Sequence, residues 1–86
     1  METKEIQLDF KDVSQTILLF CAFRYALGRR TYVVGTISNI IKANWVHMHQ
    51  IDREKYKLEI RGAIKDGLAG SKYDIKSWEQ ILALPD

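Results

Sequence analysis

Cysteine and proline are almost absent from this chain of 86 residues. The single cysteine, Cys21, excludes an internal disulfide. It stands in an apolar run, where we expect a buried, unreactive side chain in a reducing compartment. The sole proline, Pro85, stands next to last and interrupts nothing before it. The lack of proline therefore favours helices.

The chain also lacks a strong charge of either sign and a long apolar run. Thirteen Lys and Arg against eleven Asp and Glu give a net charge of +2, which does not demand a phosphate partner and disfavours a DNA mimic. The longest apolar stretch is about half the ~20 residues that span a bilayer, and no basic, apolar leader opens the chain. We therefore expect a cytoplasmic protein with no membrane partner.

What is present is the composition of an ordinary globular protein, with 47% hydrophobic and 28% charged residues. Its length corresponds to one domain over residues 1–86, with little stability to spare, so association with a partner or with itself is favoured. In residues 1–10, apolar Ile6, Leu8 and Phe10 alternate with polar residues, which predicts a short extended N-terminal arm.

Capping residues and apolar spacing predict the first of about four helices over residues 13–27. Asp12 is its expected N-cap, Gln15 stands at the capping-box position, and Gly28 is suited to a left-handed residue at its end. Because residues 17–23 are apolar on every side, we expect this helix at the centre of the domain.

Two of the other three helices have alternative starts. The second begins after Thr36 or after the earlier Thr31 and ends near Asn44, and the third begins at Asp52 as its cap. The fourth is capped by Asp74 or Ser77 and closed by Pro85. The sequence thus predicts a small all-α, single-domain bundle with a core formed by Leu19, Phe23, Ile60, Ile64, Trp78 and Ile81.

Arg24 is the one charge inside the first apolar helix, and it has three interpretations. In the first, its long stem carries the guanidinium to the domain edge. In the second, it forms a buried ion pair with Asp74, Asp12 or Asp9. In the third, it belongs to a ligand site, since Tyr25 is its neighbour and Arg29, Arg30 and Tyr32 follow.

Two further groups of basic residues have both a structural and a binding interpretation. Arg29 and Arg30 stand at the negative end of a helix dipole, where cations are stabilised without a ligand. In the third helix, basic residues recur at steps of four, and this row either forms a solvated face or contacts a phosphate backbone. The row consists of Arg53, Lys57, Arg61 and Lys65.

No catalytic or metal-binding motif can be assembled from the sequence. His47 and His49 form a His-x-His pair without a third ligand nearby, and Gly62, Gly67 and Gly70 are spaced like helix breakers rather than a phosphate-cradling loop. We therefore expect no enzyme, no metal and no cofactor, and we expect Trp45 and Trp78 to anchor the core.

Residues 23–34, FRYALGRRTYVV, together with Asp74, Trp78 and Leu82, resemble a group of small proteins encoded by phages and prophages of Gram-positive bacteria. The resemblance covers most of residues 12–84. It implies a dispensable phage accessory protein, a class that includes inhibitors of host defence and of host enzymes. It implies no catalytic residue.

These observations predict a non-catalytic phage protein that binds and inhibits or modulates a bacterial protein in the host cytoplasm, such as an anti-defence factor of the anti-CRISPR kind. The expected contact residues are Arg24, Tyr25, Arg29, Arg30, Tyr32, Arg53, Lys57 and Arg61. The alternative is a nucleotide or nucleic-acid binding protein, including one that sequesters a signalling nucleotide. A purely structural phage component and a homo-oligomer are also compatible with the sequence.

Overall fold

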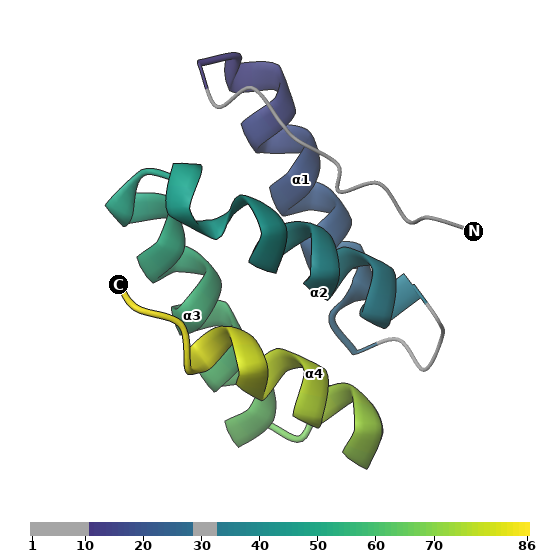
Figure 1. Ribbon diagram of the computed structural model, residues 1–86. Coiled ribbons are helices and arrows are strands. Elements are labelled where there is room, and N and C mark those ends of the chain that lie inside the picture. The colour runs from purple at the N-terminus through teal and green to yellow at the C-terminus, as the bar shows by residue number, and fades with distance from the viewer. Residues whose placement is uncertain (1–10, 29–32) are drawn as a thin grey trace, which may run out of the picture.

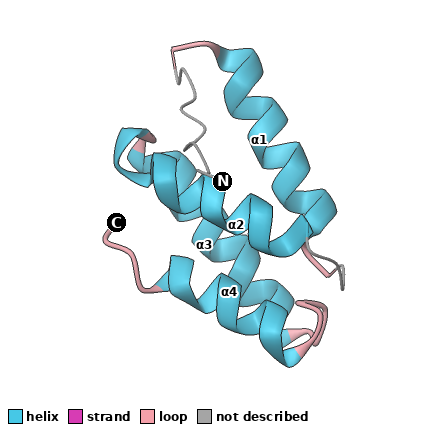
Figure 2. Cartoon of the chain, turned by 45° about the vertical axis from the view of Figure 1, so that its right-hand side comes forward, coloured by secondary structure: helices cyan, strands magenta, loops and turns pink. Residues whose placement is uncertain are grey.

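Four α-helices form the architecture of the residues that the structure describes. The computed structural model describes residues 11–28 and 33–86. The helices are α1 (Val13–Ala26), α2 (Val33–Asn44), α3 (Gln50–Lys65) and α4 (Lys72–Leu82), and a short 3-10 turn, η1 (Trp45–His47), follows α2. No strand occurs in these residues (Figure 2). The predicted all-α bundle is confirmed, while the predicted N-terminal arm lies outside the described residues.

Both predicted ends of α1 are confirmed. The backbone N–H of Ser14 donates to the Asp12 carboxylate at 2.9 Å, so the cap bonds Ser14 rather than the residue at the capping-box position. At the other end the Leu27 N–H donates to the Phe23 carbonyl, and Gly28 has a φ of +88°. That left-handed conformation suits glycine because it has no Cβ.

The predicted start of the second helix after Thr36 and the predicted start of the third at Asp52 are wrong. α2 already contains Thr36 and begins at Val33, so Thr36 is not its cap, and Thr31 lies outside the described residues. α3 begins two residues before Asp52, because extended His49 is the N-cap and its carbonyl accepts from the N–H groups of Asp52 and Arg53. Main-chain bonds, which the sequence does not reveal, set this start.

The predicted start of α4 is also wrong, and the reason is a capping box that begins earlier. The Asp74 N–H donates to the Ser71 hydroxyl at 3.3 Å, while the Ser71 N–H donates to the Asp74 carboxylate at 2.9 Å. Ser71 is therefore the N-cap, and Asp74 and Ser77 lie inside the helix. The Asp74 carboxylate thus accepts from Ser71, and Arg24 has a different partner.

Aromatic rings from three helices meet at the centre of the core. The Phe23 ring lies 4.8 Å from the Tyr56 ring and 5.5 Å from the Trp78 ring, both edge to face. Five of the six predicted core residues are buried, and Ile64 packs against them half-buried. Trp45 and Trp78 are both buried, as expected.

The helix predicted to lie at the centre lies at the edge instead. α2 packs against α1 on one side and α4 on the other, and α1 projects beyond the other helices (Figures 1 and 2). On α1, Leu19, Phe23 and Ala26 are buried, but Val13, Ile17 and Leu18 are exposed by 68%, 56% and 67%. Cys21, expected to be buried, is exposed as well. One apolar face of α1 packs on the core, and the opposite face is exposed.

Candidate binding groove

Arg24 lies at the domain edge, as the first interpretation predicted. Its side chain is 57% exposed, and Nη1 lies 3.3 Å from Glu59 Oε1 on α3. The buried pair with Asp74 is wrong, because the Asp74 carboxylate accepts from Ser71. Of the other two candidate partners, Asp12 caps α1 and Asp9 lies outside the described residues. An exposed pair of this kind joins α1 to α3 and contributes little to stability.

A groove of about 490 Å³ begins at this ion pair and runs along the C-terminal halves of α1 and α3. Gly62 is inside α3, and an added Cβ there would meet nothing within 4 Å, so the missing side chain opens the groove. The rest of the lining comes from α1, α3 and the loop after α3: Arg24, Leu27, Leu58, Glu59, Ala63, Asp66 and Leu68.

Two leucines of this groove are turned toward solvent. Leu58 is 69% exposed and Leu68 is 65% exposed, and both line the same groove. The turn after α3 holds Leu68 in place, because Gly67 has a φ of +74° and the Leu68 N–H donates to the Ala63 carbonyl at 2.8 Å. The loop thus presents an apolar side chain to the groove.

The charges that line the groove are mixed and slightly acidic. Arg24 is the one basic side chain, and Glu59 and Asp66 are the two acidic ones. Asp66 also stands at the C-terminal end of α3, which is the negative end of the helix dipole. A slightly acidic groove disfavours phosphate. It suits an apolar peptide segment whose flanking residues are neutral or basic.

The basic row of α3 does not form a continuous exposed face. Arg61 and Lys65 are exposed, but the Lys57 side chain is only 6% exposed. Arg53 is half-buried and donates from Nη1 to the carbonyl of Met48. Neither interpretation of the whole row, solvated or phosphate-binding, therefore fits Lys57 or Arg53.

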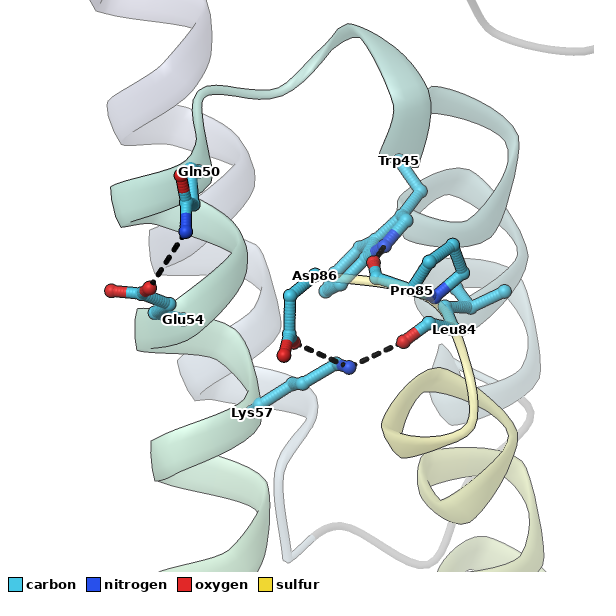
Figure 3. A network of polar contacts seen from close by, with 7 residues as sticks. All are labelled: Trp45, Gln50, Glu54, Lys57, Leu84, Pro85 and Asp86. Carbon is cyan, nitrogen blue, oxygen red and sulfur yellow. Dashed lines mark hydrogen bonds and ion pairs between the residues drawn. The ribbon is translucent and has the colours of Figure 1, made fainter.

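Lys57 instead holds the segment that follows α4. Its amine donates to the Leu84 carbonyl and lies 2.7 Å from Asp86 Oδ1 (Figure 3). Beside it the Trp45 indole N–H donates to the Pro85 carbonyl at 2.6 Å. The hydrogen bond from Lys57, its charge, and the charges of Arg61 and Arg53 lower the pKa of the exposed Asp86 carboxyl. Sequence patterns do not predict this role of Lys57, because it depends on the position of residues 84–86 in the fold.

A smaller hollow of about 120 Å³ lies between the N-terminal halves of α1 and α3. Exposed Cys21 and Ile17 line it together with Phe20, and the Lys55 amine stands 5.1 Å from the centre of the Phe20 ring. Tyr56 lines it from α3, and burial raises the pKa of its hydroxyl well above the ordinary value. Tyr56 is therefore neutral at physiological pH, and its ring packs in the core.

The remaining predicted contact residues divide into two groups. Tyr25 is exposed beside Arg24, whereas Arg29, Arg30 and Tyr32 lie outside the described residues. Sequence reasoning did not identify Leu58, Gly62 or Leu68. A signal was available for Leu58, which departs from the apolar spacing of Tyr56 and Ile60. The glycine spacing predicts a helix breaker at Gly62, but α3 continues through it.

The described part of the chain contains neither a cluster of metal ligands nor a helix suited to cross a membrane. Across residues 11–28 and 33–86, no three His, Cys, Asp or Glu side chains come together as metal ligands, and His47 and His49 are both exposed. None of the helices described there combines the length and apolar character needed to cross a bilayer.

Comparison with known proteins finds no family model, no curated protein and no solved structure that matches this chain.

Proposed function

We propose that this chain is a non-catalytic binding protein that holds a segment of a bacterial partner protein in the groove between α1 and α3. In this proposal it is a phage accessory protein that inhibits or modulates its partner, in the manner of an anti-defence factor. The observation that carries the proposal is the groove itself, with Leu58 and Leu68 exposed along it.

Covering the two leucines supplies a favourable free energy for binding. Complete burial of one leucine side chain is worth about 1.5–3 kcal/mol, and both are still about two-thirds exposed. Gly62 lets a partner backbone approach α3 closely, and the rim charges Arg24 and Asp66 can fix its direction. An apolar centre with a charged rim is the usual composition of a protein interface.

The alternative, a nucleotide or nucleic acid, is less well supported by the described residues. The groove carries one more acidic than basic side chain, and the Lys57 amine is already bonded to Leu84 and Asp86. Phosphate recognition uses convergent, available cations. We therefore favour a protein partner.

A matched pair of glycine substitutions tests the groove. Gly62 and Gly35 both lie inside helices, and an added Cβ meets nothing within 4 Å at either position. Because glutamine has the higher helix propensity by about 0.5–1 kcal/mol, we expect Gly62→Gln and Gly35→Gln to melt at or above the wild-type temperature. Only Gly62→Gln places a side chain in the groove. It should weaken binding at least ~10-fold, as other overpacked contacts do.

The measurement begins by capturing a partner from bacterial lysate and then determines its affinity for the purified variants. Gly35→Gln should bind like the wild type, and the affinity should change little with ionic strength. Equal binding by Gly62→Gln would place the interface elsewhere. A steep loss of binding with salt would instead support contact with phosphate.

A further inference from the structure

The outer face of α1 is largely apolar, with Ser14 and Arg24 as its polar residues, and it shares only Arg24 with the groove. At 3.6 residues per turn one side of the helix carries Val13, Ile17, Leu18, Cys21 and Tyr25, and all five are exposed. The opposite side carries the buried residues of the core. A helix that is apolar on both sides is normally covered on both sides.

We infer that a second copy of this chain covers this face, through an antiparallel, two-fold pairing of α1 with α1. A two-fold interface brings the same surface together from both copies, so it must be complementary to itself. The face of α1 meets this condition in both its shape and its charge, and the groove proposed above is not needed for the argument.

The shape of the face suits the pairing. Val13 and Tyr25 stand twelve residues apart at its two ends, about 18 Å along the axis at 1.5 Å per residue. In the antiparallel arrangement each Val13 side chain therefore meets the larger Tyr25 of the other copy. Leu18 lies close to the two-fold axis, where it contacts the central residues of the second helix.

The charges at the two ends of α1 are complementary under the same operation. Arg24 is the one charged residue of α1, and Asp12 caps the other end. In this register Arg24 of one copy lies opposite Ser14 of the other, about 3 Å along the axis from Asp12, a distance that the long arginine side chain spans. Arg24 is 57% exposed and bonds Glu59 through one of its N–H groups, so further donors face solvent. The two helix dipoles also oppose each other favourably.

The size of the face sets the expected strength. One face of a single helix buries less than the ~800 Å² per partner of a standard interface. We therefore expect a reversible dimer that dissociates on dilution near micromolar concentrations. The two Cys21 residues lie about 6 Å apart along the axis in this pairing, and the spacing between the two helices adds to that distance. A disulfide would be strained, so the dimer should not depend on an oxidant.

The test is the mass of the purified full chain across a dilution series by analytical ultracentrifugation. The wild type should rise from 10.0 kDa toward twice that mass with concentration. Leu18→Glu should weaken the dimer at least ~100-fold, because two charges enter the apolar centre. Tyr73→Glu is the matched control, since Tyr73 is 81% exposed on α4 and should leave the dimer unchanged.

Crosslinking locates the contact. A short bismaleimide should join the two Cys21 residues of the wild type, and Leu18→Glu should abolish the product while circular dichroism shows a folded helix bundle. Three results would overturn the inference. They are a monomer at every concentration, a dimer insensitive to Leu18→Glu, and a dimer that forms only after residues 1–10 are removed. The third result would mean that the same chain, not a second copy, covers the outer face of α1.

Discussion

Phe23→Ala should lower the free energy of unfolding by about 3–5 kcal/mol, as truncation of a buried phenylalanine does in other cores. Phe23 is fully buried, and its ring packs against Phe20, Tyr56 and Trp78. Alanine removes the ring at the point where α1, α3 and α4 meet. In a domain of this size each kcal/mol shifts the melting temperature by about 4–8 °C, so calorimetry should show a large decrease.

Leu18→Ala is the control for this effect, because Leu18 is on the same helix and 67% exposed. At a concentration where the chain is monomeric, this change should alter stability by no more than about 0.5 kcal/mol. Similar effects of the two substitutions, or an unchanged melting temperature for Phe23→Ala, would contradict the orientation of α1.

Gly28→Ala should destabilise the fold by about 2–4 kcal/mol, the sum of a left-handed backbone and an overpacked contact. Gly28 has a φ of +88°, and a Cβ there would lie 2.7 Å from the carbonyl oxygen of Leu68. That oxygen belongs to backbone, so it cannot rotate away as a flexible side chain does. The methyl group would therefore separate the end of α1 from the loop that carries Leu68.

Gly67→Ala separates the cost of the left-handed backbone from the cost of the overpacked contact. Gly67 also has a positive φ, of +74°, but its Cβ would meet nothing within 4 Å. It should cost about 1–2 kcal/mol, the backbone strain alone. Chemical unfolding of both variants measures the difference, and equal losses of stability would show that Gly28 and Leu68 are not in close contact.

Most of the fold was predictable because local chemistry determines it. Asp12 and Gly28 specify the ends of α1, and apolar spacing identifies Tyr56, Ile60, Trp78 and Ile81 as inward-facing. The starts of α3 and α4 were misplaced by two residues or more, because a backbone bond at His49 and the hydroxyl of Ser71 determine them. Several residues near each start are able to cap a helix, and only the complete geometry selects one.

The candidate site was much less predictable, because it depends on which faces are left uncovered. The apolar run in α1 indicates burial, yet periodicity cannot tell a helix covered by its own chain from one covered by a partner. Lys57 has the sequence context of a surface cation, and only the position of residues 84–86 turns it inward. Leu58 and Gly62 become informative only once α1 lies beside α3.

The most direct test of this account is the reactivity of the Cys21 thiol, because both proposals place α1 at the edge of the domain, where Cys21 is exposed. In dilute native protein a neutral thiol reagent should label Cys21 at a rate within about tenfold of the rate in denaturant, as for an exposed side chain. Labelling should slow as concentration rises and copies pair. A dilute native protein that reacts only through global unfolding, on the order of 10³-fold more slowly, would contradict the account and return α1 to the centre of the domain.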